Sequence, residues 1–251
     1  MRKLMFTLLA LTIAAALHAQ SNGPALELTY LYKNTGTGEQ RTVTLLVRGH
    51  ESLTRFFRKD TLKSRPGHGD FDISGEDDAG RQVYKNTTTG EVIFRDFMAR
   101  DGNFIPCVVA DPMKPLNWVF AAESKQIGKY TCKAASTEFR GRKYEVWYAE
   151  DIPVTHGPWK LSGLPGAIVE VRTSDQSHSF ILTRVATIPH AEIRKPGNAQ
   201  SVTIAEFVHT REQSVNDFVN RLAAALPRGA EITSVTSGDY NLETDFKDVK
   251  K

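Results

Sequence analysis

The stretch YTCKAASTEFRGRKYEVWYA, from Tyr130 to Ala149, carries the clearest fold signal in the sequence. Its two halves, Tyr130 to Phe139 and Lys143 to Ala149, flank Arg140-Gly141-Arg142, a short polar connection that contains glycine. Such a connection between two strand-like segments is typical of a β-hairpin. We therefore predict two adjacent antiparallel strands in this stretch.

The same pattern recurs on both sides of this hairpin. Apolar and polar residues alternate at 26–32 and 43–48, which is the period of a pleated strand with one buried face. Two more hairpins are predicted: Arg81 to Lys85 with Glu91 to Phe97, and Ala167 to Thr173 with Ser179 to Ile188. Consecutive hairpins favour an antiparallel meander, because parallel strands need helical crossovers, which are missing from this pattern.

One late segment, Thr203 to Leu226, has helical periodicity instead. Thr203 and Glu206 form a capping-box pattern at its start, and Pro227 and Gly229 end it. We expect this amphipathic helix to cover one face of the sheet. Because long antiparallel sheets twist and roll up, the predicted fold is mainly β: a strongly curved antiparallel sheet, an open barrel or bowl, with the helix packed on it.

The first nineteen residues have the pattern of a signal peptide. A basic head, Arg2 and Lys3, precedes an apolar run at 4–17 that is too short to span a bilayer comfortably. We expect cleavage before Gln20 and export to the periplasm, the outer membrane or the cell surface. The rest divides most simply into one domain, residues 20–245, and a frayed tail at 246–251.

Composition narrows the class of protein further. The 251 residues are 40% hydrophobic and 24% charged, which excludes a broadly disordered chain. Without the leader, the formal net charge falls from +3 to +1, and this balance argues against a nucleic-acid partner. No later segment reaches 18 consecutive apolar residues, so we predict no transmembrane helix in the mature protein.

Cys107 and Cys132 are the two cysteines of the chain. Because export delivers both to an oxidising compartment, we predict that they form one disulfide. It would tie the strand around Ile105 to Val109 to the strand that begins at Tyr130, so these strands should be near neighbours. Alternation along the second strand places Cys132 on the face of Tyr130, expected to be the inner one. A catalytic thiol lacks a local signature here.

Metal, cofactor and catalytic motifs are weak or missing. Asp70, Asp72 and Gly75 match half of a calcium loop, but Arg81 stands where the pattern needs a glutamate. His68 beside these acids is a poor zinc signal. We predict no metal and no cofactor, and we assign no catalytic residue. Carboxylates that converge only in the fold stay open as a hydrolase alternative.

A constrained loop follows the central hairpin. It leaves its strand through Pro153, and glycines and prolines give it a fixed backbone. One interpretation is a rigid corner that closes one end of the sheet; the other is a binding lip that presents Trp159 and Lys160 to a partner. The candidate binding residues are Trp147, Tyr148, Trp159, Lys160, Gly163, Leu164, Pro165 and Gly166.

The motif Gly163-Leu164-Pro165-Gly166-Ala167-Ile168 resembles the signature of the GLPGLI family, with Ala167 in place of a leucine. Flanking pieces also match the family pattern in order: Tyr-x-Cys-x-Lys-Ala, Phe-x-Gly-Arg, Trp-Tyr, Ile-Pro and Gly-Pro-x-Lys, within residues 118–170. The resemblance implies a Bacteroidota envelope protein that is similar to the bowl-shaped β domain preceding one type of N-glycanase. The family has no established catalytic residues, so none is carried over.

These observations lead to one functional hypothesis and two alternatives. We expect an exported, non-enzymatic envelope protein that binds a partner on or beside the concave side of the sheet. That partner is a peptide, a lipid or small hydrophobic ligand, or an envelope protein such as an outer-membrane transporter. The alternatives are a hydrolase whose carboxylates converge in the fold, and a purely structural scaffold.

Overall fold

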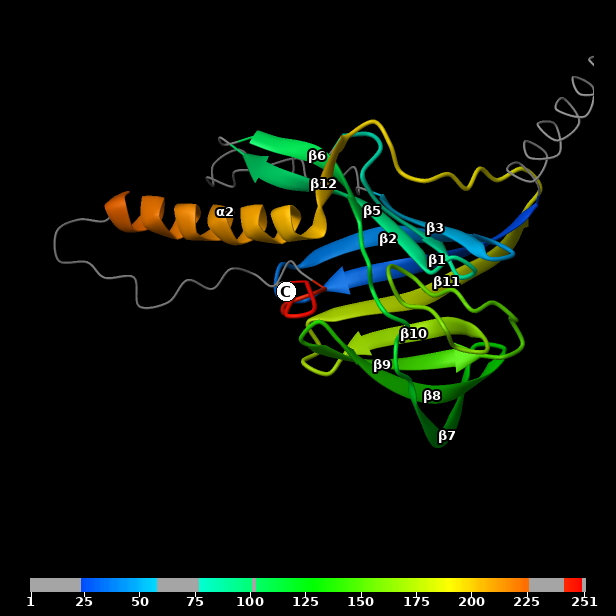
Figure 1. Ribbon diagram of the computed structural model, residues 1–251. Helices are drawn as coiled ribbons and strands as arrows, with labels where there is room; N and C mark the ends of the chain where they lie inside the picture. Colours follow the sequence, from blue (N-terminus) through cyan, green and yellow to red (C-terminus); the bar gives the residue numbers. More distant parts are fainter. Residues whose placement is uncertain (1–23, 58–76, 101–102, 226–241, 250–251) are drawn as a thin grey trace, which may run out of the picture.

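The computed structural model describes residues 24–57, 77–100, 103–225 and 242–249 (Figure 1). The predicted signal peptide, the half calcium loop with His68, and the residues that end the helix lie outside the described residues. The strands are β1 Ala25–Asn34, β2 Glu39–Arg48, β3 Glu51–Phe57, β4 Arg81–Asn86, β5 Glu91–Arg100, β6 Asn103–Ala110, β7 Val119–Ile127, β8 Tyr130–Phe139, β9 Arg142–Ala149, β10 Ala167–Thr173, β11 His178–Ile188 and β12 Gln200–Thr203. The helix labelled α2 is Ile204–Ala225.

The twelve strands of the described residues belong to one open, curled sheet with the order β12-β6-β5-β4-β3-β2-β1-β11-β10-β9-β8-β7. Each neighbouring pair is antiparallel except β12 and β6, which run parallel. The pairing of β1 with β11 joins the two halves of the meander. The three predicted hairpins and the mainly β, strongly curved fold are therefore confirmed. The sheet does not close, because β12 and β7 remain at its two edges.

The main core fills the concave side of the sheet. Strand β1 illustrates how the sequence builds this core, since Leu28, Tyr30 and Tyr32 are buried at alternate positions and therefore share one face. Tyr30 donates its hydroxyl hydrogen to the carbonyl of Ile168, 2.9 Å away, and so links β1 to β10 across the core. The main core also includes Val43, Leu45, Val83, Phe94, Val109, Val146, Trp159, Leu161, Leu164, Ile168, Phe180 and Phe246.

Helix α2 covers the β5–β6 part of the sheet (Figure 1). The backbone N–H of Glu206 donates to Thr203 Oγ1 over 3.1 Å, which is the predicted cap at the start of the helix. Phe207 packs edge-to-face on Phe94, with ring centres 5.1 Å apart. Among the described residues, no helix combines the length and apolar character needed to cross a bilayer.

Residues 242–249 return to the sheet after the helix and pack beside the β8–β9 turn. Phe246 is only 3% exposed and belongs to the main core. The expectation that 246–251 form a frayed tail is therefore wrong at Phe246, because an aromatic side chain anchors the segment.

The predicted disulfide is also wrong. Cys107 on β6 and Cys132 on β8 are free, buried thiols, and eight strands separate β6 from β8 in the sheet order. Cys107 lies in the main core, whereas Cys132 packs with Ala149 and Val169 on the opposite face. Cys132 is therefore not on the inner face either. Burial raises the pKa of the Cys107 thiol to about 12, which makes it unreactive at neutral pH.

We predict that unfolding without a reductant leaves both cysteines open to alkylation, with two labels per chain in the mass spectrum. The melting temperature should not change when dithiothreitol is added, because no crosslink restrains the unfolded chain. Protein that accepts the labels only after reduction would contradict the strand order.

Candidate functional site

The loop between β9 and β10, residues 150–166, folds over one end of the main core; we call it the corner. Its backbone is tied to itself, since the N–H of Gly157 donates to Leu161 O over 2.9 Å and that of Gly163 to Thr155 O over 2.7 Å. Gly163 has a φ of 98°, which favours glycine. At Gly166 a Cβ would overlap the carbonyl of Ala149, so the last glycine of the motif permits close packing against β9.

The corner turns most of the predicted binding residues inward. Trp159 and Lys160 are 6% and 2% exposed, so neither side chain is presented to a partner, contrary to the binding-lip interpretation. The cause for Lys160 is a set of buried carboxylates described below. Tyr148, Leu164 and Gly166 are buried, Trp147 is half-buried, and Gly163 and Pro165 are exposed.

Four charged side chains meet beneath the corner, and we call them the ion cluster: Asp111, Arg140, Lys160 and Glu243. Lys160 Nζ lies 2.6 Å from Asp111 Oδ2 and 2.9 Å from both carboxylate oxygens of Glu243. Arg140 binds Asp111 through two nitrogens, at 2.8 and 2.6 Å, and Glu243 at 2.6 Å. No side chain of the four exceeds 9% exposure.

The ion cluster joins four segments that are far apart in the sequence. Asp111 follows β6, Arg140 forms the β8–β9 turn, Lys160 belongs to the corner, and Glu243 belongs to residues 242–249. Two cations offset two carboxylates, and Asp248 adds a peripheral contact to Arg140 at 3.1 Å. Burial alone would raise the pKa of Asp111, but Lys160 and Arg140 outweigh burial and hold that pKa below its ordinary value.

Aromatic rings surround the two cations. Lys160 Nζ lies 4.3 Å from the ring centre of Phe94, and Arg140 Cζ lies 5.0 Å from those of Phe139 and Phe246. Rings at these distances attract the cations and displace water. Because the local dielectric is low, the ion pairs are strong, but losing one partner is costly.

A buried lysine outside the ion cluster, Lys85, also supports the corner. Lys85 on β4 donates from Nζ to the carbonyls of Gly157 and Leu161, at 2.7 and 2.6 Å. Burial lowers the pKa of Lys85 to about 7. Its neutral form has two N–H groups, which match these two acceptors. Burial and then Lys85 lower the pKa of His156 to about 3, so its imidazole is neutral at physiological pH.

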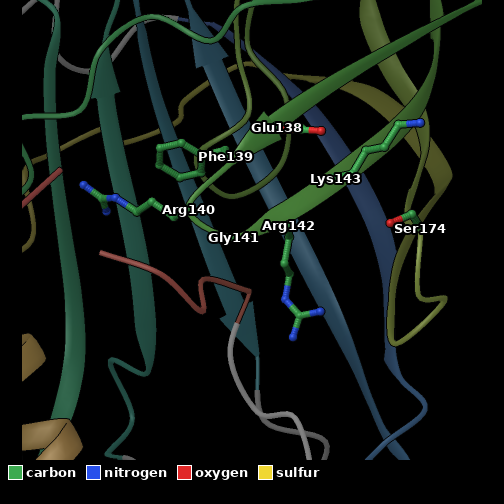
Figure 2. A pocket seen from close by; sticks show the side chains of 7 residues that line it. All are labelled: Glu138, Phe139, Arg140, Gly141, Arg142, Lys143 and Ser174. Atoms are coloured by element: carbon green, nitrogen blue, oxygen red, sulfur yellow. The ribbon is translucent and has the colours of Figure 1, made fainter. Parts of the chain in front are cut away.

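The β8–β9 turn also borders a hollow of about 490 Å³ lined by residues 138–143 and Ser174 (Figure 2). Arg140 and Lys143 leave the turn in opposite directions, and Arg140 reaches the ion cluster. Arg142, between them, pairs with Asp175. Within the described ranges, no group of three or more histidine, cysteine or acidic residues could hold a metal ion.

Strand β7, at one edge of the sheet, is almost entirely exposed. Eight of its nine residues are exposed, including Val119 at 68% and Phe120 at 58%. Trp118, just before it, donates from Nε1 to Ser162 O over 2.9 Å and so fastens the start of β7 to the corner. Phe120 packs on Tyr148 with ring centres 6.2 Å apart. Sequence reasoning missed β7.

Comparisons with known proteins support the fold and leave the function open. A family model described as "Protein of unknown function (Porph_ging)" matches residues 136–170, the stretch with the predicted binding residues and both cluster cations. The GLPGLI name stays a prediction. No curated protein matches the chain.

Two solved structures of PNGF-II, an N-glycanase, are similar to the chain. In the P21 crystal form the identity is 17% and the TM-score 0.51, over 76% of this chain and 34% of that one. In the C2 form the identity is 18% and the TM-score 0.52, over 76% and 33%. This chain thus spans about a third of the length of PNGF-II. The predicted likeness to an N-glycanase domain therefore holds at the level of the fold.

We predict that Lys85 makes stability rise with pH. The unfolded chain binds more protons than the folded one between pH 7 and the ordinary lysine pKa of 10.5. The free energy of unfolding should increase by about 2 kcal/mol between pH 7 and about 9. Urea titrations of the wild type, Lys85→Met and the exposed control Lys143→Met measure this. If the free energy of unfolding rose equally with pH in all three proteins, the lowered pKa of Lys85 would be refuted.

Proposed function

We propose that the protein is an exported, non-enzymatic envelope protein that binds another polypeptide along β7. The observation that carries the proposal is the exposure of this edge strand, with two large apolar residues, Val119 and Phe120, at its start. An edge strand has backbone N–H and C=O groups that an added strand can pair with. The exposed apolar side chains supply contact area beside that backbone.

A polypeptide fits this surface better than a small ligand does. The concave side is filled by the main core and covered by the corner and residues 242–249, so binding beside the sheet is favoured over binding inside it. The edge itself is supported from behind, because Trp118 is fastened to Ser162 and Phe120 rests on Tyr148. A supported edge loses little conformational entropy when it binds.

The carboxylates that do converge in the fold favour a structural role over hydrolysis. Asp111 and Glu243 both accept hydrogen bonds from Arg140 and Lys160, and all four side chains are buried. A carboxylate whose lone pairs are occupied in this way is a poor general base, and for Asp111 the two cations also hold the pKa below its ordinary value.

The likeness to PNGF-II supports the proposal through the fold alone. There the similar fold occupies about a third of a longer chain, so such a module works beside further polypeptide. An envelope protein, such as an outer-membrane transporter, is the partner we propose here.

We predict that Phe120→Ser weakens partner binding at least about tenfold, whereas Phe57→Ser leaves it unchanged. Both phenylalanines are exposed, at 58% and 47%, so neither change empties the core. In exporting cells treated with a lysine crosslinker, Lys125 and Lys129 of the wild type should join to one defined polypeptide. Mass spectrometry should show these crosslinks reduced about tenfold or more by Phe120→Ser.

The matched control separates a docking site from general stickiness. Crosslinks that persist in Phe120→Ser, that vanish equally in Phe57→Ser, or that map only to Lys143 on β9 would contradict docking along β7.

A further inference from the structure

Residues 242–249 lie on the protein in the way a bound peptide lies on a receptor. The Leu242 carbonyl accepts a hydrogen bond from the hydroxyl of Tyr144, and the N–H groups of Thr244 and Asp245 donate to Arg140 O at 2.9 and 3.0 Å. The Glu243 carboxylate enters the ion cluster. Three residues later, the ring of Phe246 contacts two guanidinium groups, and its centre lies 5.0 Å from Arg140 Cζ and 4.7 Å from Arg211 Cζ.

The surface beneath this segment is shaped for a peptide backbone. A Cβ added to Gly141 would lie 2.9 Å from Asp245 Cβ and 3.0 Å from its nitrogen, so any side chain there would displace the segment. Arg140, next to Gly141, has a positive φ of 43°, and both its carbonyl and its guanidinium contact residues 243–245. The turn thus provides two backbone contacts and one charge contact.

The surface beneath residues 242–249 carries a buried positive charge that an acidic ligand would neutralise. Without Glu243, the cluster would contain Arg140 and Lys160 against Asp111 alone, a surplus of one buried positive charge. Asp111 contacts both cations and is itself unexposed, so each cation keeps one carboxylate partner when Glu243 is absent. One further carboxylate brings the net charge of the cluster to zero.

We propose that this surface is a peptide-binding site for the pattern Glu-x-x-Phe, filled in cis by Glu243 to Phe246. The same pattern on another polypeptide would bind there when the chain's own segment leaves. The site differs from β7 in position and in ligand chemistry, since it selects a carboxylate and an aromatic ring at a fixed spacing. In the wild type the attached segment competes at a high effective concentration and keeps the site closed.

The test uses the full mature chain with Glu243→Gln and Phe246→Ala, which weakens the segment in cis. The probe is a synthetic peptide of residues 242–249, LETDFKDV. Calorimetry should show the variant binding this peptide at least about tenfold more tightly than the wild type does. The same peptide with Glu243→Gln should bind at least about tenfold more weakly than the unmodified one. Lys247→Ala, at an 88% exposed side chain, is the matched control and should behave as the wild type.

A folded variant that binds neither peptide, or both equally, would overturn the proposal. Should the double variant not fold, Phe246→Ala alone decides. The site then requires that the peptide raise the melting temperature of Phe246→Ala, and that the Glu243→Gln peptide fail to do so. No rise with either peptide would also overturn the proposal.

Discussion

The structure depends on one buried electrostatic constraint, the pairing of Lys160 and Arg140 with Asp111 and Glu243. Removing one partner from such a cluster leaves an unpaired charge in an apolar site, at a cost of about 3–5 kcal/mol. Because each charge comes from a different segment, the positions of the corner, the β8–β9 turn, the end of β6 and residues 242–249 are mutually dependent. The Gly-rich motif serves this arrangement by letting the corner fold tightly over β9.

Because of this constraint, we propose a binding surface on β7 instead of on the corner. The corner turns Trp159 and Lys160 into the protein, so those two residues support the fold from inside. The exposed surface lies on β7, and the hydrogen bond from Trp118 to the Ser162 carbonyl fastens the start of this strand to the corner. The stretch matched by the family model, residues 136–170, thus contains Tyr148 and Ser162, which support β7. Strand β7 itself lies outside that match.

Local patterns could be predicted from the sequence, and spatial relations could not. The hairpins and the helix cap follow from alternation, turn glycines and Thr203, all of which act within a few residues. Strand β7 was missed because both of its faces are exposed, which removes the alternation. The disulfide failed because strand order and inner face are set by long-range pairing. Arg140 and Glu243 are 103 residues apart, and the one local signal was a cation beside an aromatic residue, in Phe139-Arg140 and Trp159-Lys160.

A double-mutant cycle on Lys160 and Glu243 tests the central claim most directly. The free energy of unfolding would be measured by urea titration for the wild type, Lys160→Met, Glu243→Gln and the double variant. Since the two groups meet at 2.9 Å in a buried cluster, the account predicts a coupling energy of about 2 kcal/mol or more. Additive effects, with a coupling below about 0.5 kcal/mol, would contradict it, because the cluster would then not join the corner to residues 242–249.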